Sequence, residues 1–542
     1  MIKNSCLIKK NKELFNYRSN NKNIILVEYN NFHGSHLCQA LLANFFKKKN
    51  SSKIIAYFNY SLIVSPLKIN FLQKLKWQLS TLLLLGFKKI YQSFGVEAFL
   101  RPEISKNITI KAEKVRDRFF KNLKGNKDIV NFKIGKIWIG DLIYDTYLKS
   151  RLVPTINLNT KDFKSFFKEF LELFFYWQDY FKSNKVSQII GVHSCYSYGI
   201  PIRIAMNVGV PSYIINTRAV MKIDKKVQSM YGDSKFFKNS FSKINEKYKK
   251  DILEFAKKNL DTRVSGKAGV KVGLVNRSKS SFLKISKVKK AVLSQNSKIK
   301  ILICTHDFMD SIHVNGKNFF PDFYLWISFL GKLSNEKFNN YEFYIKNHPY
   351  FGNKYERYQK YTEKFVNQLI EKFPNIKKIP NNTSHHQIIA EGINYVLTVY
   401  GSVGIEYAYL GIPVINASKN NPHINYNFNI NPKNLYEYKK ILYNLKKVKL
   451  NIKKNEIYEC YFMKHFYYDE NWLFDDYQSF LKNIGGYHNV HTNKLYDYWE
   501  KNLDENLKNK IYDRFDKFQK SSYNRLTIFD SEKEEKIFRS KK

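Results

Sequence analysis

The stretch from Tyr395 to Ala417 constrains the fold more than any other part of this sequence. Two apolar runs, at 395–399 and 412–416, enclose a glycine-containing turn at 400–404 and a short helical segment at 405–410. An apolar run that stops at glycines and resumes after one helix is typical of a βαβ unit in a parallel sheet. The sequence therefore predicts an α/β fold in which this stretch belongs to a doubly wound, Rossmann-like sheet.

The glycine turn has the features of a site for a phosphate-bearing sugar. Gly401 and Gly404 permit a sharp turn and let a ligand approach the backbone beside Tyr400, while the amides that open the next helix favour an anion. Ser402 adds a hydroxyl donor, and Glu406 lies within reach of a sugar hydroxyl. We interpret the turn as a binding site for a nucleotide sugar. The alternative is a structural turn in which Glu406 only complements the helix dipole.

The composition narrows the class of protein further. A chain of 542 residues is expected to fold as two or three domains, and 44% hydrophobic residues are ample for packed cores. The net charge of +46 favours anionic partners, such as a membrane surface or phosphorylated substrates. Lysine is spread along the whole chain, so a chain-wide residue bias explains the charge equally well. No zinc-finger or RNP-type motif occurs, and nucleic acid is not an expected partner.

The cysteines and the apolar segments predict a cytoplasmic protein, peripheral at the inner face of the cytoplasmic membrane. Five scattered cysteines without a Cys-x-x-Cys pair favour reduced thiols and no thiolate metal site. Residues 1–15 lack the apolar core of a signal peptide, and no apolar run reaches the ~18–20 residues that cross a bilayer. The segment 71–94 has an apolar centre flanked by lysines, which suits a helix in the lipid interface or an ordinary core helix.

The N-terminal part, residues 1–264, is predicted to be one Rossmann-like domain. Its expected strands lie at 24–29, 53–58, 188–192 and 211–215. His36 follows the first strand, and Asp141 and Asp145 lie in the segment 134–149, where a loop could direct them into a cleft. All three are candidates for a catalytic base, although Asp141 could equally cap a helix.

A basic segment, 265–299, is predicted to link this domain to a second one. Together with Lys300 it carries ten basic residues and no acidic residue, and it shows little periodicity. The second Rossmann-like domain is predicted at 300–450, beginning with a strand at 300–305. Residues 451–542 are expected to form a helical C-terminal extension whose last part contacts a partner or nothing.

Polar side chains follow the predicted strands of the second domain. Lys346 and His348 come at the end of a strand, and one fixed cation with one imidazole suits a phosphate. A polar substrate-binding loop is predicted from three residues at spacings of four and three: His306, Asp310 and His313. These three could suggest a metal site, but no further ligands complete it, and no metal is expected. Asn421 and His423, in a later loop, could touch the sugar or phosphate.

Together these features resemble a GT-B glycosyltransferase, and the chain looks most like bacterial capsule and lipopolysaccharide surface-carbohydrate biosynthesis proteins. The resemblance spans about residues 20–445 and is strongest in the second half. Six segments carry it: GDLIYDTYLK (140–149), VHSCYSYGIPIRIAMNVGVP (192–211), THDFMDSIHVNGKNFFPDFYLW (305–326), YIKNHP (344–349), LTVYGSVGIEYAYLGIPVI (397–415) and NPHINY (421–426). The His-Pro element is also similar to that of bacterial sialyltransferases and Kdo transferases.

The resemblance implies two doubly wound domains with a cleft between them, the acceptor side in the first and the nucleotide sugar in the second. It implies four donor-binding residues: Lys346, His348, Ser402 and Glu406. His348 would contact the nucleotide phosphate, Glu406 would bind the ribose, and a base in the first domain would deprotonate the acceptor. Because the chain has no Asp-x-Asp motif, the phosphate charge would be met by protein groups, without a metal or other cofactor.

The leading hypothesis is therefore a metal-independent, inverting glycosyltransferase that moves a sugar from a nucleotide sugar to a growing glycan or lipid-linked acceptor. The donor type, hexosyl, Kdo or sialyl, stays open. The alternative enzyme is a nucleotide-sugar 2-epimerase, which has a related fold but needs no acceptor and is usually shorter. A non-catalytic scaffold of the capsule machinery is a third hypothesis.

Overall fold

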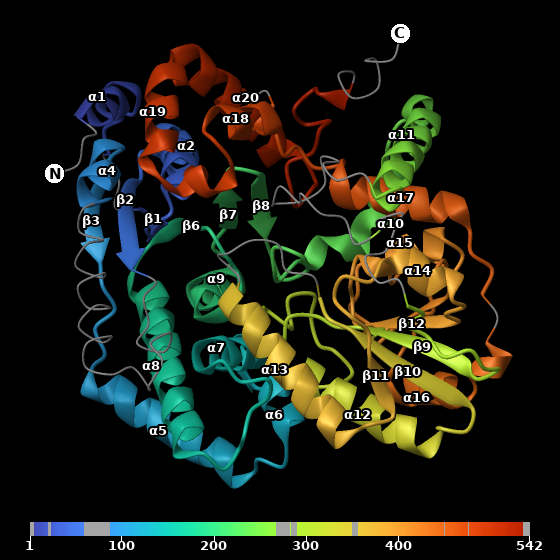
Figure 1. Ribbon diagram of the computed structural model, residues 1–542. Coiled ribbons are helices and arrows are strands. Elements are labelled where there is room, and N and C mark those ends of the chain that lie inside the picture. Colours follow the sequence, from blue (N-terminus) through green and yellow to red (C-terminus); the bar gives the residue numbers. More distant parts are fainter. Residues whose placement is uncertain are drawn as a thin grey trace. The chain divides into compact units, whose positions relative to one another are not determined.

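The structure is a computed structural model that describes residues 5–19, 23–58, 87–266, 282, 290–348, 356–448, 450–474 and 476–534. These residues form two compact units, drawn in Figure 1. Unit 1 contains those within 5–151, 157–230 and 468–534, and unit 2 those within 152–156 and 231–467. Each unit is built on its own parallel sheet with helices around it, which confirms the predicted α/β class.

Unit 1 has a six-stranded sheet in the order β3-β2-β1-β6-β7-β8, parallel except for β8, which pairs antiparallel with β7. The strands are β1 (Ile24–Tyr29), β2 (Lys53–Phe58), β3 (Val96–Leu100), β6 (Val186–Gly191), β7 (Ser212–Asn216) and β8 (Ala219–Ile223). A two-stranded ribbon joins β4 (Lys133–Ile134) to β5 (Ile137–Trp138). The four predicted strands are confirmed to within two residues, whereas β3 and β8 were not predicted.

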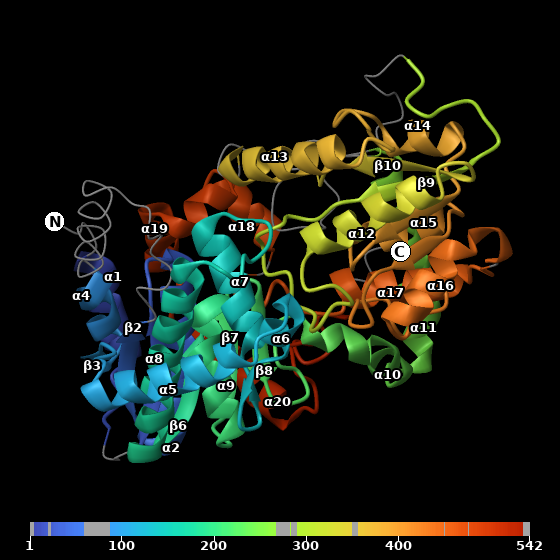
Figure 2. The same cartoon turned by 90° about the horizontal axis from the view of Figure 1, so that it is seen from below.

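Helices cover both faces of this sheet, as a parallel sheet requires. The helices that lie before residue 231 are α1 (Ser5–Leu14), α2 (His33–Asn50), α4 (Lys88–Ser93), α5 (Lys106–Lys121), α6 (Asn126–Asn131), α7 (Gly140–Arg151), α8 (Lys161–Ser183), the short η3 (Tyr196–Tyr198) and α9 (Gly199–Asn207). One face packs on α2, through Ile25, Val27 and Ala56. The opposite face packs on α8, where Tyr57 meets Trp177, and α8 lies beside α9 (Figure 2).

The C-terminal helices complete the core of unit 1. They are α18 (Tyr477–Asn483), η7 (Tyr487–His491), α19 (Asn493–Asn502) and α20 (Glu505–Lys520). Leu495, Trp499 and Phe515 are fully buried in the same cluster as Leu41 and Phe45 of α2, and Figure 1 shows the red α19 and α20 beside the blue α1 and α2. The prediction that this tail contacts a partner or nothing is therefore wrong, because it packs on its own chain.

Unit 2 has an all-parallel sheet in the order β11-β10-β9-β12-β13. The strands are β9 (Ile299–Cys304), β10 (Tyr341–Lys346), β11 (Ile376–Lys378), β12 (Tyr395–Thr398) and β13 (Val414–Asn416). The helices are η4 (Gly232–Phe236), α10 (Phe237–Ser242), α11 (Glu246–Val264), α12 (Phe323–Glu336), α13 (Glu356–Lys372), α14 (His385–Ala390), α15 (Val403–Tyr409), α16 (Leu435–Tyr443), η6 (Leu445–Lys447) and α17 (Lys454–His465). In Figure 1, α14 and α15 lie on one side of the strands and α12 and α16 on the other.

The observed units differ from the expected boundaries at two places. Helix α11, which the sequence analysis placed in the N-terminal domain, packs on α17 in unit 2. The expected extension 451–542 is divided: α17 belongs to unit 2 and the later helices to unit 1. Most of the basic linker 265–299 and most of the segment 71–94 lie outside the described residues; within 87–94, Ile90, Tyr91 and Phe94 are core residues.

Candidate functional site

The strand order of unit 2 places a topological switch point between β9 and β12. From β9 the chain runs outward to β10 and β11, then returns to the other side of β9 as β12. In open α/β sheets, ligands bind outside the carboxyl ends of the two strands at such a point. The residues there are His306, after β9, and the turn Tyr400–Ser402, after β12. The stretch that dominated the sequence analysis therefore lies at the switch point.

His306 ties the two loops of this switch point together. Its Nε2 lies 3.0 Å from the Thr398 hydroxyl and accepts the Val399 N–H at 3.3 Å, while Thr398 Oγ1 accepts the Gly401 N–H at 3.2 Å. The ring also stacks on Phe323. Burial lowers the pKa of His306 to about 3, so the ring is neutral. With Nε2 occupied, His306 supports the turn, and the predicted polar loop does not use this nitrogen for a ligand.

The two glycines of the turn are required by packing. A Cβ on Gly404 would lie 2.7 Å from His423 Cε1, and one on Gly401 would lie 2.8 Å from Thr398 Oγ1. Packing therefore gives these glycines a structural reason, and their role in ligand approach stays a prediction. Gly401 and Ser402 themselves are half-buried, and the Ser402 hydroxyl makes no capping bond to α15.

Glu406 is buried on α15 and forms an ion pair through Oε1 with Nε of Arg263 on α11. The charge of Glu406 is the main cause that raises the pKa of the Arg263 guanidinium. Sequence reasoning placed Glu406 correctly in the first turn of the helix but missed Arg263, which is 143 residues away in the chain. No local signal in the sequence joins the two.

Lys346 and His348, at the end of β10, have different environments. Lys346 is 5% exposed, and its Nζ donates to the backbone carbonyls of Asn381 and Thr383 at 3.1 and 3.0 Å. Burial lowers its pKa to about 8. The predicted phosphate contact of Lys346 is therefore wrong, because its ammonium is used to hold a loop. His348 is exposed and stays a prediction as a phosphate ligand.

The remaining predicted donor residues divide between interior and surface. Asp310 is exposed, whereas His313 is buried. Asn421 Oδ1 accepts the His423 N–H at 2.8 Å, and His423 Nδ1 lies 3.2 Å from Asn429 Nδ2 beneath Gly404. Burial lowers the pKa of His423 well below its ordinary value. Asn421 and His423 thus shape the core below the turn. Within the described residues, no group of three or more His, Cys, Asp or Glu side chains is arranged to hold a metal.

Unit 1 places the predicted base His36 in its interior. The ring is fully buried in the first turns of α2, with Nδ1 2.5 Å from the Tyr496 hydroxyl and Nε2 2.9 Å from the Asn30 carbonyl. Burial lowers its pKa to about 3. Since both nitrogens are engaged and the ring is inaccessible, the expectation of a cleft-facing base at His36 is wrong.

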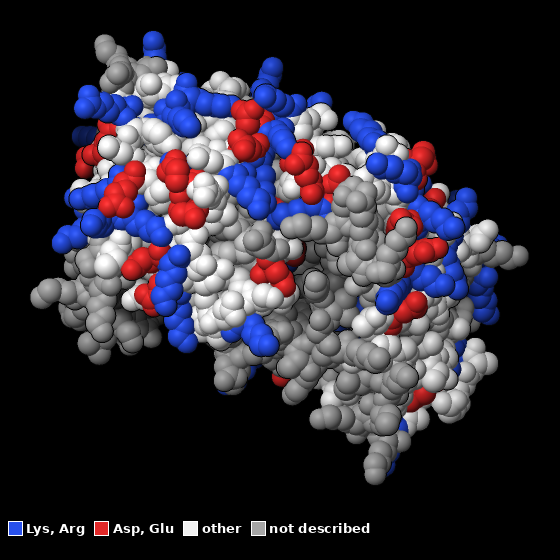
Figure 3. All heavy atoms as spheres, turned by 90° about the horizontal axis from the view of Figure 1, so that it is seen from above, with Lys and Arg blue, Asp and Glu red and all other residues white. Residues whose placement is uncertain are grey.

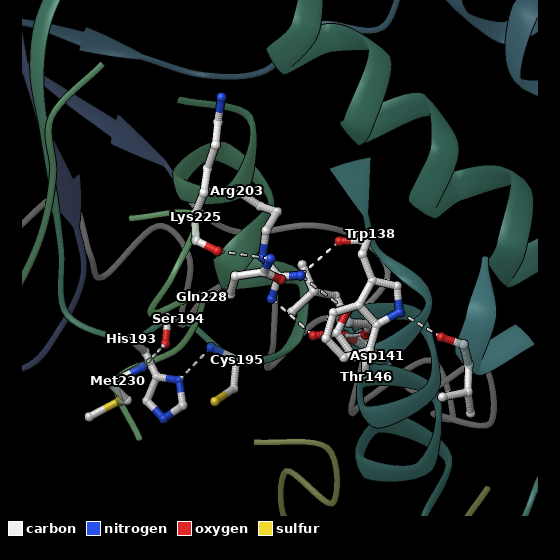
Figure 4. A network of polar contacts seen from close by, with 12 residues as sticks. Trp138, Asp141, Thr146, His193, Ser194, Cys195, Arg203, Lys225, Gln228 and Met230 are labelled. Carbon is white, nitrogen blue, oxygen red and sulfur yellow. Dashed lines mark hydrogen bonds and ion pairs between the residues drawn. The ribbon is translucent and has the colours of Figure 1, made fainter. Parts of the chain in front are cut away.

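Asp141 and Asp145 lie on helix α7, in place of the expected loop, and both are buried. Figure 4 shows Asp141 facing Arg203, which binds both of its carboxylate oxygens at 3.3 and 2.9 Å and also donates to the Trp138 carbonyl at 2.7 Å. A carboxylate held in this way is a structural anchor, which removes Asp141 as a base candidate. Asp145 is buried as well, and its role as a base stays a prediction.

The switch point of unit 1, between β1 and β6, contains a carboxylate that sequence reasoning missed. Glu28 Oε2 accepts the Val192 N–H at 2.9 Å, and Gly191 leaves room for it because a Cβ there would lie 3.2 Å away. Burial and the Glu28 charge raise the pKa of Tyr198 to about 12. The signal was present in the sequence, as one acidic residue inside the apolar strand IILVEY. In the next loop Ser194 Oγ accepts the Met230 N–H at 2.9 Å (Figure 4).

Each unit is thus a Rossmann-like α/β unit in which a polar side chain bridges the switch point: the buried Glu28 in unit 1 and the half-buried His306 in unit 2. No protein-family model and no curated protein matches the chain. Among solved structures, it is similar to the β-Kdo 2,4 transferase KpsC of Thermosulfurimonas dismutans (13% identity, 51% of this chain and 79% of that one, TM-score 0.31). It is also similar to a UDP-GlcNAc 2-epimerase of Neisseria meningitidis (11% identity, 81% of this chain and 97% of that one, TM-score 0.24). A third similar structure is a glycosyltransferase of Rickettsia africae (12% identity, 89% of this chain and 100% of that one, TM-score 0.24).

These neighbours are a Kdo transferase, a nucleotide-sugar epimerase and a glycosyltransferase, three kinds of protein that the sequence analysis also named. With TM-scores of 0.24 to 0.31 the likeness is distant, and the function proposed below rests on the site.

Charged side chains are spread over the face drawn in Figure 3. Lys and Arg lie at many places among its described residues, with Asp and Glu between them. None of the helices within the described ranges is long and apolar enough to span a bilayer.

Proposed function

We propose that this protein is a glycosyltransferase that moves a sugar from a nucleotide sugar to a growing surface polysaccharide. The observation that supports the proposal is the switch point of unit 2. There, a half-buried Gly401–Ser402 turn is held by His306, and a buried carboxylate, Glu406, follows one helical turn later. In an open parallel sheet this is the position that ligands occupy.

The residues divide the work of binding the donor. Ser402, whose hydroxyl is not used as a cap, and His348, exposed at the end of β10, would meet the phosphate. Glu406 would accept hydrogen bonds from the ribose. We propose that the reaction needs no metal, because protein groups meet the developing phosphate charge. Asp145 is the proposed base for the acceptor hydroxyl, and inversion is the proposed stereochemical course.

A thermal-shift series with CMP, UDP, GDP and their sugar conjugates tests the donor site. A ligand at a hundredfold excess over its Kd raises stability by ~2.7 kcal/mol, so one nucleotide family should give a clear shift. The shift should persist in EDTA and disappear in Glu406→Gln and His348→Ala. No shift with any of them would overturn the proposal and favour the scaffold hypothesis.

Product analysis separates the two enzymes. A glycosyltransferase releases the nucleotide only when an acceptor glycan is present, whereas a 2-epimerase converts the nucleotide sugar without one. Asp145→Asn should abolish transfer and leave the nucleotide-induced shift unchanged if Asp145 is the base.

We also propose that the protein works in the cytoplasm, at the anionic inner face of the membrane. The net charge of +46 supports this, because basic residues near an anionic surface contribute about 1 kcal/mol each. Cosedimentation with phosphatidylglycerol vesicles, but not with phosphatidylcholine vesicles, is the expected result. Equal binding to DNA would indicate a non-specific charge effect.

A further inference from the structure

Glu406 is fixed by one partner. Arg263 Nε pairs with Oε1, and the two side chains come from different helices of unit 2, α11 and α15. Among the described residues no second hydrogen bond to this carboxylate occurs, so Oε2 is the oxygen left for a ligand. The ion pair lies in the interior, since the Glu406 side chain is only 7% exposed and the Arg263 side chain 20%.

The last turn of α11 holds this region at two further points. The Tyr409 hydroxyl of α15 donates to the Asp261 carboxylate, and His386 Nε2 of α14 lies 2.6 Å from the Val264 carbonyl. These two contacts attach α11 to its neighbours without involving Glu406. Arg263 differs from them because it alone contacts the carboxylate of the proposed donor site.

We propose that Arg263 is a positioning residue that sets Glu406 for the ribose of the nucleotide. A glutamate side chain has three rotatable bonds, and a buried carboxylate without a cation is costly, so the ion pair both offsets the cost of burying Glu406 and fixes its direction. With Oε1 held by Arg263, Oε2 accepts the hydrogen bond from a ribose hydroxyl. The inference rests on the proposed role of Glu406 in donor binding.

The test compares each of the nucleotides UDP, CMP and GDP with its 2′,3′-dideoxy form by isothermal titration. A hydrogen bond to a charged group is worth ~1.5–3 kcal/mol, so the wild type should prefer one ribonucleotide by about 10-fold or more. Glu406→Gln and Arg263→Met should both reduce that preference to less than about 3-fold. The matched control is Asp261→Asn, which replaces the charged acceptor of the neighbouring α11–α15 hydrogen bond by a neutral amide and should keep the preference.

A second variant, Arg263→Lys, keeps the test usable if Arg263→Met does not fold. It keeps the positive charge but has no N–H at the position of Nε, so it should fold and still lose most of the preference for the ribonucleotide. If Glu406→Gln loses the preference and the two Arg263 variants keep it, Arg263 is not a positioning residue and the donor site stands. If Asp261→Asn loses the preference for the ribonucleotide as strongly as Arg263→Met does, α11 only supports the fold, and the inference is overturned. If the wild type binds no nucleotide, the proposed function and this inference fail together.

Discussion

The two switch points of this chain have the same topology and opposite surroundings. In unit 1 the crossing side chain is an acid, Glu28, and the adjacent first turn of α2 is covered: a Cβ on Gly34 would lie 2.9 Å from Thr217 and 3.2 Å from Val490. In unit 2 the crossing side chain is a neutral imidazole, His306, and the adjacent Gly401–Ser402 turn is half-buried.

A switch point is a place where a ligand can bind, but other elements of the fold can also cover it. In unit 1 the C-terminal helices bury the first turn of α2 together with His36. In unit 2 the turn keeps an unused hydroxyl at Ser402. Changes at the first point should therefore act on stability, and changes at the second on ligand binding.

The largest difference in stability between the two units is expected at low pH. Burial lowers the pKa of His306, His385 and His423 in unit 2, and of His33 and His36 among the described residues of unit 1. Their unfolded forms take up protons below the ordinary value of 6.5, and the folded forms do so only near pH 3 for His36 and His306. The stability that these histidines contribute is thus fully present above pH 6.5 and is lost as the pH drops from there toward 3.

Each such histidine removes up to about 1.4 kcal/mol of stability per pH unit, so unit 2 should lose up to about 4 kcal/mol and unit 1 up to about 3 kcal/mol per pH unit. Hydrogen exchange at pH 7.5, 6 and 5, resolved by peptide, should show β9–β13 losing protection before β1–β8. The control is His423→Asn, which removes one titrating ring from unit 2 and should reduce its slope. Equal loss in both units would contradict the comparison.

Breaking the buried ion pair of unit 1 should give the next largest effect. Arg203→Met leaves the Asp141 carboxylate buried without its cation, and such changes cost about 3–5 kcal/mol. Denaturant unfolding measures the loss. The double variant Arg203→Met with Asp141→Leu should recover a large part of it, because no charge then stays uncompensated. Nucleotide binding by unit 2 should be unchanged in any variant that folds.

Much of the fold was predictable because it depends on local patterns. Apolar runs such as 24–29 and the glycine stretch 395–417 marked strands to within two residues. The position of Glu406 in a first helical turn followed from the same pattern. By contrast, the segment with Asp141 was compatible with a loop or with a helix capped by Asp141, and the chain folds it into α7 and buries it against Arg203.

The side-chain roles were less predictable because they depend on partners far away in the chain. Lys346 and His348 are two residues apart, yet one is buried on backbone carbonyls and the other is exposed. Arg263 binds Glu406, and Tyr496 binds His36. No nearby sequence pattern indicates either pair. Burial of a polar residue follows from tertiary packing, which periodicity does not encode.

A smaller loss of stability should distinguish a closely packed glycine from one with open space around it. Gly404→Ala places a Cβ 2.7 Å from His423 Cε1 and 2.8 Å from Asn429 Nδ2, in the core. Overpacking of this kind costs about 1–3 kcal/mol, which exceeds the gain of about 1 kcal/mol from alanine in a helix. The control is Gly125→Ala, where no atom lies within 4 Å of the new Cβ; because Gly125 is the N-cap of α6, only the cap preference, about 1 kcal/mol or less, should be lost. An unchanged stability for Gly404→Ala would show that the turn is not packed as described.

The smallest change in stability, with a clear change in binding, is expected for Ser402→Ala. Its hydroxyl makes no capping bond, so its removal should alter the free energy of unfolding by less than about 0.5 kcal/mol. Loss of a hydrogen bond to a charged phosphate should weaken nucleotide binding by about 10-fold or more. Ser194→Ala in unit 1 is the opposite case: its buried hydroxyl accepts the Met230 N–H, so its loss costs about 1–3 kcal/mol and leaves binding intact. If Ser402→Ala binds nucleotide like the wild type, the turn of unit 2 is as structural as that of unit 1, and the contrast between the two switch points disappears.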